Sequence, residues 1–514
     1  MSKRAIDDDD DTGEQSDLPI AKRKEIGLVQ LDRLSTLSNE LILNILSFLP
    51  MPSLITCQVL SHRFNDLCKD SEIWKMHYFN TWVRPRACQT ARVESSSLQP
   101  KTNYSPQVST WLDHGHLATE MTNWKSQYRL RQNWYRGVCR VSEIEFSEPP
   151  SRRALVQLCA GIVVVADTHG LQVWAANDPA RCLARISFSE ESKILFHPEL
   201  KTTLKPTALA VGNFEEQQMI VVGFGNGQVS RYVLHIQTHR LCLQSSHRER
   251  KAAITSVALS WPFLMMNFDF KLSLYRLRAP DEKEIDWHQV ATLQSGKGIG
   301  SLNLSLFTSA LDIVARIVYN FYHNGCGWAL KIQELRFNKE GHQTRSRLTD
   351  TVHSQYSIHP LRGTQIPSII HPKPPTSISY SHPYLLTSHS DNTLTMYLVV
   401  SDANSLFIGE GQRLWGHTSS VSTVQVTNRG KAVSMSSRGK EIRVWELEPT
   451  ARQPFQNDSI QIIPDEKPFD SQLPDGAGID EDLVQLECVG FDEERVLIRR
   501  EGIMGTQLAC YDFT

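Results

Sequence analysis

From Arg140 onward, one short pattern recurs along the chain: a turn, then alternating apolar residues that end in an aromatic residue or a substitute for one. Alternation of apolar and polar positions over roughly four to eight residues is the period of a half-buried β-strand. Recurrence at intervals of tens of residues indicates one β unit repeated along the chain. The endings are Trp174, Tyr232, Tyr275, Gln333, Tyr397, Trp445 and Tyr511.

Two further positions accompany the endings. An acid or amide stands six residues before the ending in three repeats, and a histidine, His247 or His417, stands 28 residues before Tyr275 and Trp445. This arrangement resembles degenerate WD repeats, in which His, Ser/Thr, Asp and Trp form a hydrogen-bonded network within a blade. The resemblance therefore gives structural roles, and no chemistry, to His247, Asp269, Asp391, His417 and Trp445. Gly439 stands where the clearest copy should have its Asp, so we expect the burial of β faces to hold most blades.

The repeats predict an all-β propeller of about seven blades over residues 139–514. About 53 residues per blade exceeds the usual length of roughly 40–45, which fits insertions at 449–480 and near 340–375 and leaves an eighth blade open. The segment Cys139–Phe146 alternates as a strand should. We expect it to lie beside Ala509–Phe513 and complete the last blade, because closure removes exposed strand edges.

The stretch Leu37–Trp74 is instead helical in pattern. A first helix carries apolar residues on more than one side, and Pro50 and Pro52 are expected to end it. Ser53 is expected to cap a second helix that runs through Phe64 and Leu67, and Asp70 a third. The surplus apolar surface of the first helix indicates a partner protein, since a helix with only its own small domain to cover shows a narrower stripe.

This three-helix pattern resembles an F-box, with Ser38 where the family usually has proline; a serine suits a helix start through its hydroxyl. The resemblance implies docking into the Skp-family adaptor of a cullin and RING ubiquitin ligase. The alternative is a small helical domain with an ordinary core. The residues expected to bind the adaptor are Leu37, Leu41, Ile42, Ile45, Leu46, Leu49, Pro50, Leu54 and Trp74.

These features divide the chain into four segments. Residues 1–30 are expected to form a disordered charged tail, 31–82 the F-box, 83–138 a linker with a helix near 122–136, and 139–514 the propeller. Trp124, Tyr128 and Gly137 resemble the linker that joins F-box and WD repeats in related proteins. Lys3-Arg4 and Lys22-Arg23-Lys24 suggest a nuclear import signal, although a solvated tail explains them equally well.

Composition excludes several classes of protein. With 54 basic and 56 acidic residues the net charge is −2, so we expect no nucleic-acid partner. The ten cysteines include no Cys-x-x-Cys pair, and no apolar run is long enough to span a membrane. We therefore expect a protein of the cytoplasm or nucleus, with no membrane partner.

Candidate chemistry is weak. Gly223-x-Gly225-x-Gly227 lies between two strand-like runs, which predicts a hairpin rather than a phosphate loop. His323 and Cys326 offer two metal ligands where a structural site normally needs four. We expect no enzyme activity, no metal and no cofactor.

The expected function is substrate recognition within an SCF-type ubiquitin ligase, the F-box binding the adaptor and the propeller binding the protein to be ubiquitinated. Some relatives read phosphorylated motifs through arginines; Arg438 matches one such position, whereas Ser422 stands at a second. The alternative is that Arg438 is an ordinary solvated residue of a loop. The alternative functions are a WD-repeat scaffold with no part in ubiquitination and an enzyme hidden in the propeller channel.

Overall fold

The computed structural model describes most of the chain and shows two compact units, one within Met1–Ile73 and one within Trp74–Thr514. The described residues are 34, 36–84, 123–144, 146, 150, 154–188, 204–214, 217–248, 252–268, 271–278, 287–294, 302–309, 312–352, 356–358, 365–367, 369–402, 404–437, 441–447, 459–465, 485–502 and 505–514. The proposed tail, residues 86–110 of the proposed linker, Asp269, Arg438 and Gly439 lie outside them.

The described part of the first unit contains α1 (Asn39–Ser47), α2 (Met51–Cys57) and α3 (His62–Leu67). The prediction of one helix through Ile55 and Phe64 was wrong, because the chain breaks between α2 and α3. Ser53 lies inside α2, and Pro50 is the residue that precedes its first turn. Proline has no N–H to lose at that place, so Pro50 and Pro52 separate α1 from α2 and also start α2. Ser61 caps α3, its hydroxyl accepting from the Phe64 N–H at 3.2 Å.

Ser38 does precede α1, but its hydroxyl makes no capping hydrogen bond to the helix. It instead lies against the Glu40 carboxylate, whose pKa is lowered by its own backbone N–H and then by Ser38. The start of α1 is held by Arg63 of α3, which donates to the Leu37 carbonyl at 2.7 Å and to Asn39 Oδ1 at 2.8 Å. The start of α1 is therefore fixed by bonds from α3, and the expected hydroxyl cap at Ser38 is not formed.

After α3, the described residues before the β domain form α4 (Ser71–Tyr78), the π-helix η1 (Phe79–Val83) and α7 (Trp124–Arg136). Asp70 Oδ1 accepts from the Glu72 N–H at 2.9 Å, as expected of the cap at the start of α4. Asn123 caps α7, and Gly137 ends it in the left-handed conformation with φ 69°. A Cβ at Gly137 would come within 2.3 Å of the Gln461 carbonyl oxygen, so only glycine fits this turn.

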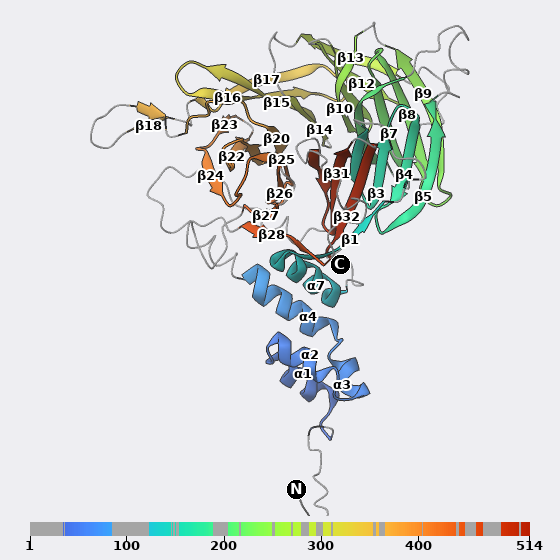
Figure 1. Cartoon of the computed structure of the whole chain (residues 1–514), viewed down its shortest axis with the longest axis vertical. Helices are drawn as coiled ribbons and strands as arrows, with labels where there is room; N and C mark the ends of the chain where they lie inside the picture. Colours follow the sequence, from blue (N-terminus) through green and yellow to red (C-terminus); the bar gives the residue numbers. More distant parts are fainter. Residues whose placement is uncertain are drawn as a thin grey trace, which may run out of the picture. The chain divides into compact units, whose positions relative to one another are not determined.

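The β domain is a propeller of seven blades (Figure 1), which confirms the predicted fold class. The first blade contains β2 (Leu155–Cys159), β3 (Ile162–Ala166), β4 (Gly170–Ala175) and β5 (Asp178–Ser187). The second contains β6 (Pro206–Phe214), β7 (Gln217–Phe224), β8 (Gln228–His235) and β9 (Arg240–Arg248). The third contains β10 (Ile254–Ser260), β11 (Phe263–Phe268), β12 (Lys271–Leu277) and β13 (Trp287–Gln294). The fourth is β14 (Leu302–Thr308), β15 (Ile313–His323), β16 (Gly327–Phe337), β17 (Gln343–Asp350).

The remaining blades follow the same plan. The fifth blade contains β20 (Ser377–Ser381), β21 (Tyr384–Ser388) and β22 (Thr393–Ser401), and both β23 (Leu406–Ile408) and β24 (Gln412–Trp415) pair with β22. The sixth contains β25 (Val421–Val426), β26 (Lys431–Ser436), β27 (Ile442–Glu446) and β28 (Ser459–Gln461). The seventh contains β30 (Gln485–Phe491), β31 (Arg495–Gly502), β32 (Gly505–Asp512), β1 (Val138–Glu143) and β29 (Ile463–Pro464). A separate hairpin pairs β18 (Tyr356–Ile358) with β19 (Gln365–Pro367).

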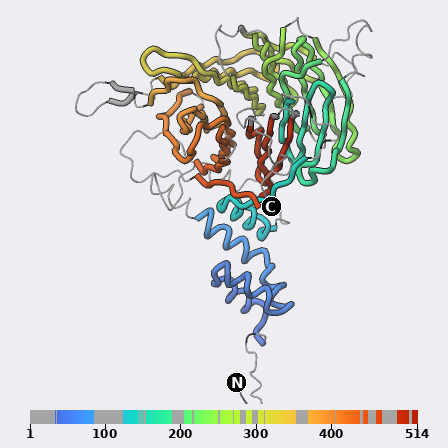
Figure 2. The backbone as a smooth tube through the Cα atoms, in the orientation of Figure 1, coloured from blue at the N-terminus to red at the C-terminus, as the bar shows by residue number. Residues whose placement is uncertain are grey.

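Each predicted ending lies in the third strand of its blade, from Trp174 in β4 to Tyr511 in β32. The first strand of each blade contacts the first strand of the next, and β30 contacts β2, so the ring is closed. The tube in Figure 2 shows this in colour, because the red C-terminal strands lie between the orange sixth blade and the green first ones. The core lies between neighbouring sheets, where β3 and β7 are buried along almost their whole length.

Closure follows the prediction. The strand β1 pairs antiparallel with β32, from Arg140 opposite Asp512 to Glu143 opposite Ala509. One blade is therefore built from both ends of the domain. The glycines from Gly223 to Gly227 form the hairpin between β7 and β8, as predicted.

Candidate partner-binding sites

Helix α1 has two apolar faces. Ile42 and Leu46 are buried, each with 2% of its surface exposed. Leu41, Ile45 and Phe48 are four and three residues apart, which places them in one stripe on another face, and all three are exposed. Phe48, the residue after the helix, has 82% of its surface in contact with solvent. This stripe is the surplus apolar surface that the sequence indicated.

The exposed surface continues beyond α1. Ile55, Val59 and Leu60 are exposed, Val59 to 83%. Clusters of exposed apolar groups within one short segment are typical of interaction sites. We call Leu41, Ile45, Phe48, Ile55, Val59 and Leu60 the apolar face.

The predicted adaptor-binding residues divide by exposure. Leu41, Ile45 and Pro50 are exposed, and Leu37 and Leu49 are half-buried. Ile42, Leu46, Leu54 and Trp74 are buried, so they shape the helices rather than present side chains to a partner. The apolar face also contains Phe48, Ile55, Val59 and Leu60, which are exposed and were not among the predicted residues. Their apolar character was visible in the sequence, but which face each one occupies depends on the break between α2 and α3.

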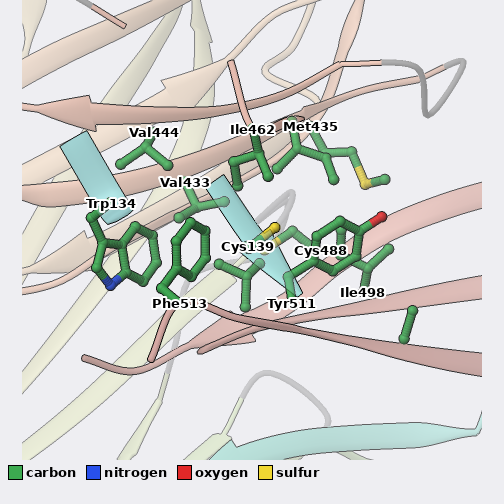
Figure 3. Packing of buried hydrophobic residues seen from close by; sticks show 13 residues of the cluster. Trp134, Cys139, Val433, Met435, Val444, Ile462, Cys488, Ile498, Tyr511 and Phe513 are labelled. Carbon is green, nitrogen blue, oxygen red and sulfur yellow. The ribbon is translucent and has the colours of Figure 1, made fainter. Parts of the chain in front are cut away.

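The second candidate region is the joint between α7 and the propeller. The Trp134 ring stacks on the Phe513 ring with centroids 3.8 Å apart and planes 10° apart, as Figure 3 shows. Trp134 Nε1 donates to the Glu493 carbonyl at 2.8 Å, and Asn133 Nδ2 donates to the Phe513 carbonyl at 2.8 Å. The joint therefore fastens α7 to the seventh blade by packing and by two hydrogen bonds.

Charges surround the joint. Lys431 places its ammonium 4.2 Å from the centre of the Trp134 ring, and burial lowers the pKa of this lysine. Burial also acts to lower the pKa of Arg131, but Tyr78 and then Glu446 outweigh it and raise that pKa. Arg131 Nη1 donates to the Tyr78 hydroxyl at 3.4 Å, which ties α7 to α4 within the second unit.

Aromatic rings complete the contact between α4, η1 and α7. Tyr78 lies 5.5 Å from Trp124, and Trp82 lies 5.3 Å from Tyr135, measured between ring centroids. Trp74 and Tyr128 meet edge to face at 5.8 Å. Such pairs contribute roughly 0.5–1.5 kcal/mol each beyond the area they bury. The aromatic residues that the sequence singled out in the linker, Trp124 and Tyr128, thus pack on aromatic residues of α4 and η1.

The sixth blade contains a complete hydrogen-bonded network, which corrects the expectation based on Gly439. His417 Nε2 lies 2.6 Å from Ser434 Oγ, and Trp445 Nε1 donates to the same oxygen at 2.7 Å. The carboxylate comes from Glu441, whose Oε2 lies 3.2 Å from His417 Nδ1 and accepts from the Thr418 N–H at 2.9 Å. A carboxylate two positions further along replaces the missing Asp, so this blade keeps its network.

The other structural residues have different surroundings. His247 lies in β9 and stacks on Trp287 with centroids 5.6 Å apart, and its ring is 5.4 Å from Tyr275. Asp391 accepts from the Thr393 hydroxyl at 2.6 Å in the turn before β22. Ser422 lies in β25, where its hydroxyl donates to the Met435 carbonyl at 3.1 Å. These contacts hold the blades together, as a structural role requires.

A cluster of arginines was missed by sequence reasoning. Glu334 in β16 is bonded by Arg316 and Arg336, each at 3.0 Å, and also by Arg347 and by Ser401 of the fifth blade. Burial would raise the pKa of Glu334, but the hydrogen bonds of Arg347, Ser401, Arg336 and Arg316 hold it at about 2. These arginines are bound to a carboxylate within the chain, and the cluster fastens the fourth blade to the fifth.

His323 and Cys326, the two possible metal ligands in the sequence, lie close together. Cys326 Sγ lies 3.3 Å from His323 Nδ1, but no group of three or more His, Cys, Asp or Glu suited to a metal occurs in the described part of the chain. Among the helices that the structure describes, none has the length and apolar character needed to cross a bilayer.

Comparison with protein families agrees with this architecture. The family model described as F-box protein pof12 beta-propeller matches residues 139–514, well over half of the chain. This chain belongs to that family. The model described as F-box-like matches residues 35–80, the segment that carries the apolar face. Neither family model matched by this F-box propeller protein indicates an enzyme.

Individual relatives match over shorter segments. The F-box protein pof12 of Schizosaccharomyces pombe is 31% identical over 138 residues, which are 27% of this chain and 28% of the relative. The F-box protein dre-1 of Caenorhabditis elegans is 42% identical over 53 residues, 10% of this chain and 6% of the relative. The matched region thus spans about a quarter or less of either relative. Among solved structures, the RRP9 WD40 repeats align with a TM-score of 0.40 at 10% identity, over 73% of this chain and 97% of that one.

Proposed function

We propose that this F-box propeller protein is the substrate receptor of an SCF-type ubiquitin ligase. Its F-box binds a Skp-family adaptor, through which it joins the cullin and RING subunits, and its propeller binds the protein to be ubiquitinated. The observation that carries the proposal is the apolar face of the F-box-like segment, with Phe48 and Val59 more than four-fifths exposed. A face of this kind is stabilised when a partner covers it.

The receptor works without bond chemistry of its own. By holding a substrate and the ligase core together it raises the effective concentration of substrate lysines near the conjugating enzyme. A well-defined joint serves this role, and the stacking of Trp134 on Phe513 fastens α7 to the propeller. We place this activity in the cytoplasm or the nucleus.

Adaptor binding by purified full-length protein tests the proposal. Phe48→Asp and Val59→Asp, made singly and together, remove exposed side chains, so the helices should still form. Burying each apolar side chain contributes about 1.5–3 kcal/mol, so each variant should weaken adaptor binding by roughly ten- to a hundredfold. Phe307→Asp, at an exposed phenylalanine of β14, is the matched control.

Circular dichroism accompanies the measurement to show that each variant is folded. Wild-type protein that fails to bind the adaptor at micromolar concentration would overturn the proposal. Equal binding by wild type and the folded double variant would show that the adaptor binds outside the apolar face. Adaptor-independent copurification with other proteins would favour the alternative, a WD-repeat scaffold outside ubiquitination.

A further inference from the structure

A cavity of about 320 Å³ lies on the inner ring of the propeller. Its lining residues belong to β2, β6 and β10, the first strands of the first three blades, and to β30 and β31 of the seventh. These first strands are neighbours, because β30 contacts β2, β2 contacts β6 and β6 contacts β10. We call this space the channel cavity.

The channel cavity lies toward one end of the propeller. Leu155 is the first residue of β2, and Thr207 and Thr255 are the second residues of β6 and β10. The first strands of a propeller run in the same sense along its axis, so their starts lie at one end. The turn at Glu493, to which Trp134 of α7 donates, follows the end of β30. The cavity is therefore nearer the end of the propeller opposite α7.

Apolar side chains form much of the wall of the channel cavity, namely Leu155, Val156, Leu209, Val257 and Val489. Each of them is only half-buried, so part of its surface remains accessible. A hydrocarbon stem gains free energy by covering apolar surface of this kind, and an amphipathic side chain can do so while its charged tip stays on polar groups. The walls therefore suit a long, flexible side chain with a polar end.

The channel cavity also contains an ion pair. Glu487 in β30 lies opposite Arg499 in β31, and Arg499 Nη2 donates to Glu487 Oε2. Arg499 Nη1 donates in addition to the Ala154 carbonyl, so two nitrogens of the guanidinium are bound to the wall. The Glu487 side chain is 43% exposed, against 18% for Arg499. The carboxylate is thus the more accessible of the two charges, which favours a cationic ligand.

Hydroxyl groups supply further acceptors, since Thr207, Thr255 and Ser256 line the cavity from β6 and β10. The Thr207 hydroxyl donates to the Gly223 carbonyl at 3.2 Å, and the Thr255 hydroxyl donates to the Asn267 carbonyl at 3.1 Å and accepts from Asn267 Nδ2 at 2.9 Å. A hydroxyl oxygen has two lone pairs, so each threonine can also accept from a ligand. A compact cation with several N–H groups matches such a set of oxygens.

We propose that the channel cavity binds the side chain of a lysine carried by a partner protein. The methylene stem lies against the apolar walls, and the ammonium donates to the Glu487 carboxylate and to the hydroxyl oxygens of β10. Lysine suits the site better than arginine, because a guanidinium uses both oxygens of a carboxylate for its paired hydrogen bonds and one oxygen of Glu487 already accepts from Arg499. Identifying the partner as a protein to be ubiquitinated rests on the proposed function, whereas lysine binding itself does not.

Saturation-transfer NMR with full-length protein measures this binding. The probe is N-acetyl-lysine N-methylamide, which presents one lysine side chain on a capped backbone. Wild type should bind it saturably, with a Kd on the order of 1 mM or lower. Acetylating the side-chain nitrogen of the probe removes its charge and should weaken binding by about tenfold or more. Replacing lysine by ornithine, which has a shorter stem, should weaken binding by about threefold.

Glu487→Gln removes the negative charge and keeps an acceptor for Arg499, and it should weaken binding of the lysine probe by about tenfold or more. Glu494→Gln is the matched control. Glu494 is 44% exposed and pairs with Arg495 at 2.9 Å, but it lies in the turn after β30, at the other end of the blade. The control should keep the affinity within about twofold. Circular dichroism shows whether both variants are folded.

The proposal is wrong if wild type shows no saturable binding up to about 10 mM probe, or if the acetylated probe binds as tightly as the lysine probe. Equal affinity of folded Glu487→Gln and the Glu494→Gln control would also contradict it. The acetylated and ornithine probes are measured on wild type, so they test the site even if Glu487→Gln does not fold.

Adaptor pull-down by the same proteins separates this inference from the proposed function, because Glu487→Gln should leave adaptor binding unchanged. Lysine binding without adaptor binding would contradict only the proposed function. Adaptor binding without lysine binding would contradict only the inference about the channel cavity.

Discussion

The apolar face and the joint use the same kind of residue in opposite ways. Phe48 at the end of α1 is 82% exposed, whereas Trp134 in α7 is 4% exposed and stacked on Phe513. Both are large aromatic residues on short helices, and the sequence around each one does not show which of the two is buried. The difference teaches that burial depends on tertiary packing: α7 packs on the propeller, while the apolar face is exposed in the described part of the chain.

Opening the propeller ring should have the largest effect on the stability of the second unit. Deleting residues 505–514 removes the whole of β32, to which both β1 and β31 are paired. We expect the unfolding midpoint of the whole β domain to fall sharply, because two open edges replace a closed blade. Thermal unfolding followed by circular dichroism is the measurement, and an unchanged midpoint would contradict closure.

Trp134→Ala tests the joint itself. Loss of a buried tryptophan should lower the free energy of unfolding of the second unit by about 3–5 kcal/mol. Tyr135→Ala, at the half-exposed neighbouring position, is the control and should cost much less. Urea unfolding with tryptophan-independent detection distinguishes them, and equal effects would mean that the stack on Phe513 contributes little.

Glu441→Ala tests the network of the sixth blade. The change leaves His417 and the Thr418 N–H without their carboxylate, so we expect a loss of about 1–3 kcal/mol in stability. Glu441→Gln keeps an acceptor for Thr418 and should lose less. If Ala and Gln are equally harmless, burial of the β faces alone holds this blade, as the sequence first suggested.

Acid should weaken the fifth blade through two stacked histidines, His371 and His389, whose rings lie 3.9 Å apart. Burial lowers the pKa of His371 to about 4 and that of His389 to about 3; Arg413 lowers and Asp391 raises both values. The unfolded chain takes up these protons first, so the stability contribution is complete above pH 6.5 and is lost as the pH falls toward 4.

The variant His371→Phe keeps a flat ring and cannot titrate. Between pH 7 and pH 5, wild type should therefore lose about 2 kcal/mol more stability than the variant. Urea unfolding at the two pH values measures the difference. Parallel loss in both proteins would place the acid sensitivity elsewhere.

The smallest expected effect belongs to the apolar face. Phe48→Asp should change the stability of the isolated protein by less than about 0.5 kcal/mol, because an exposed side chain loses little on replacement. Thermal unfolding of the variant measures this directly. A large loss of stability would show that Phe48 already packs within the chain, which would remove the contrast with Trp134.

Much of the fold was predictable because its signals are local. Alternation in each third strand marked the seven blades, and the same alternation at Cys139–Phe146 identified the strand that closes the ring. Capping was predicted less well. Ser38 precedes α1 but makes no capping bond, and Pro50, not Ser53, is the residue before α2. Short helices compete among several possible starts, and packing between helices chooses among them.

The sequence by itself determined the β repeat, the strand character of Cys139–Phe146 and the presence of surplus apolar surface on the F-box-like helices, since each depends on neighbours a few residues apart. Only the tertiary structure decided that Glu441 completes the network with His417, that Glu334 binds three arginines, and that Glu487 shares a cavity with Thr255. These contacts depend on strand register and on which strands are neighbours in the ring. Neither is written in local periodicity, because a strand pattern repeats every two residues and is compatible with several registers.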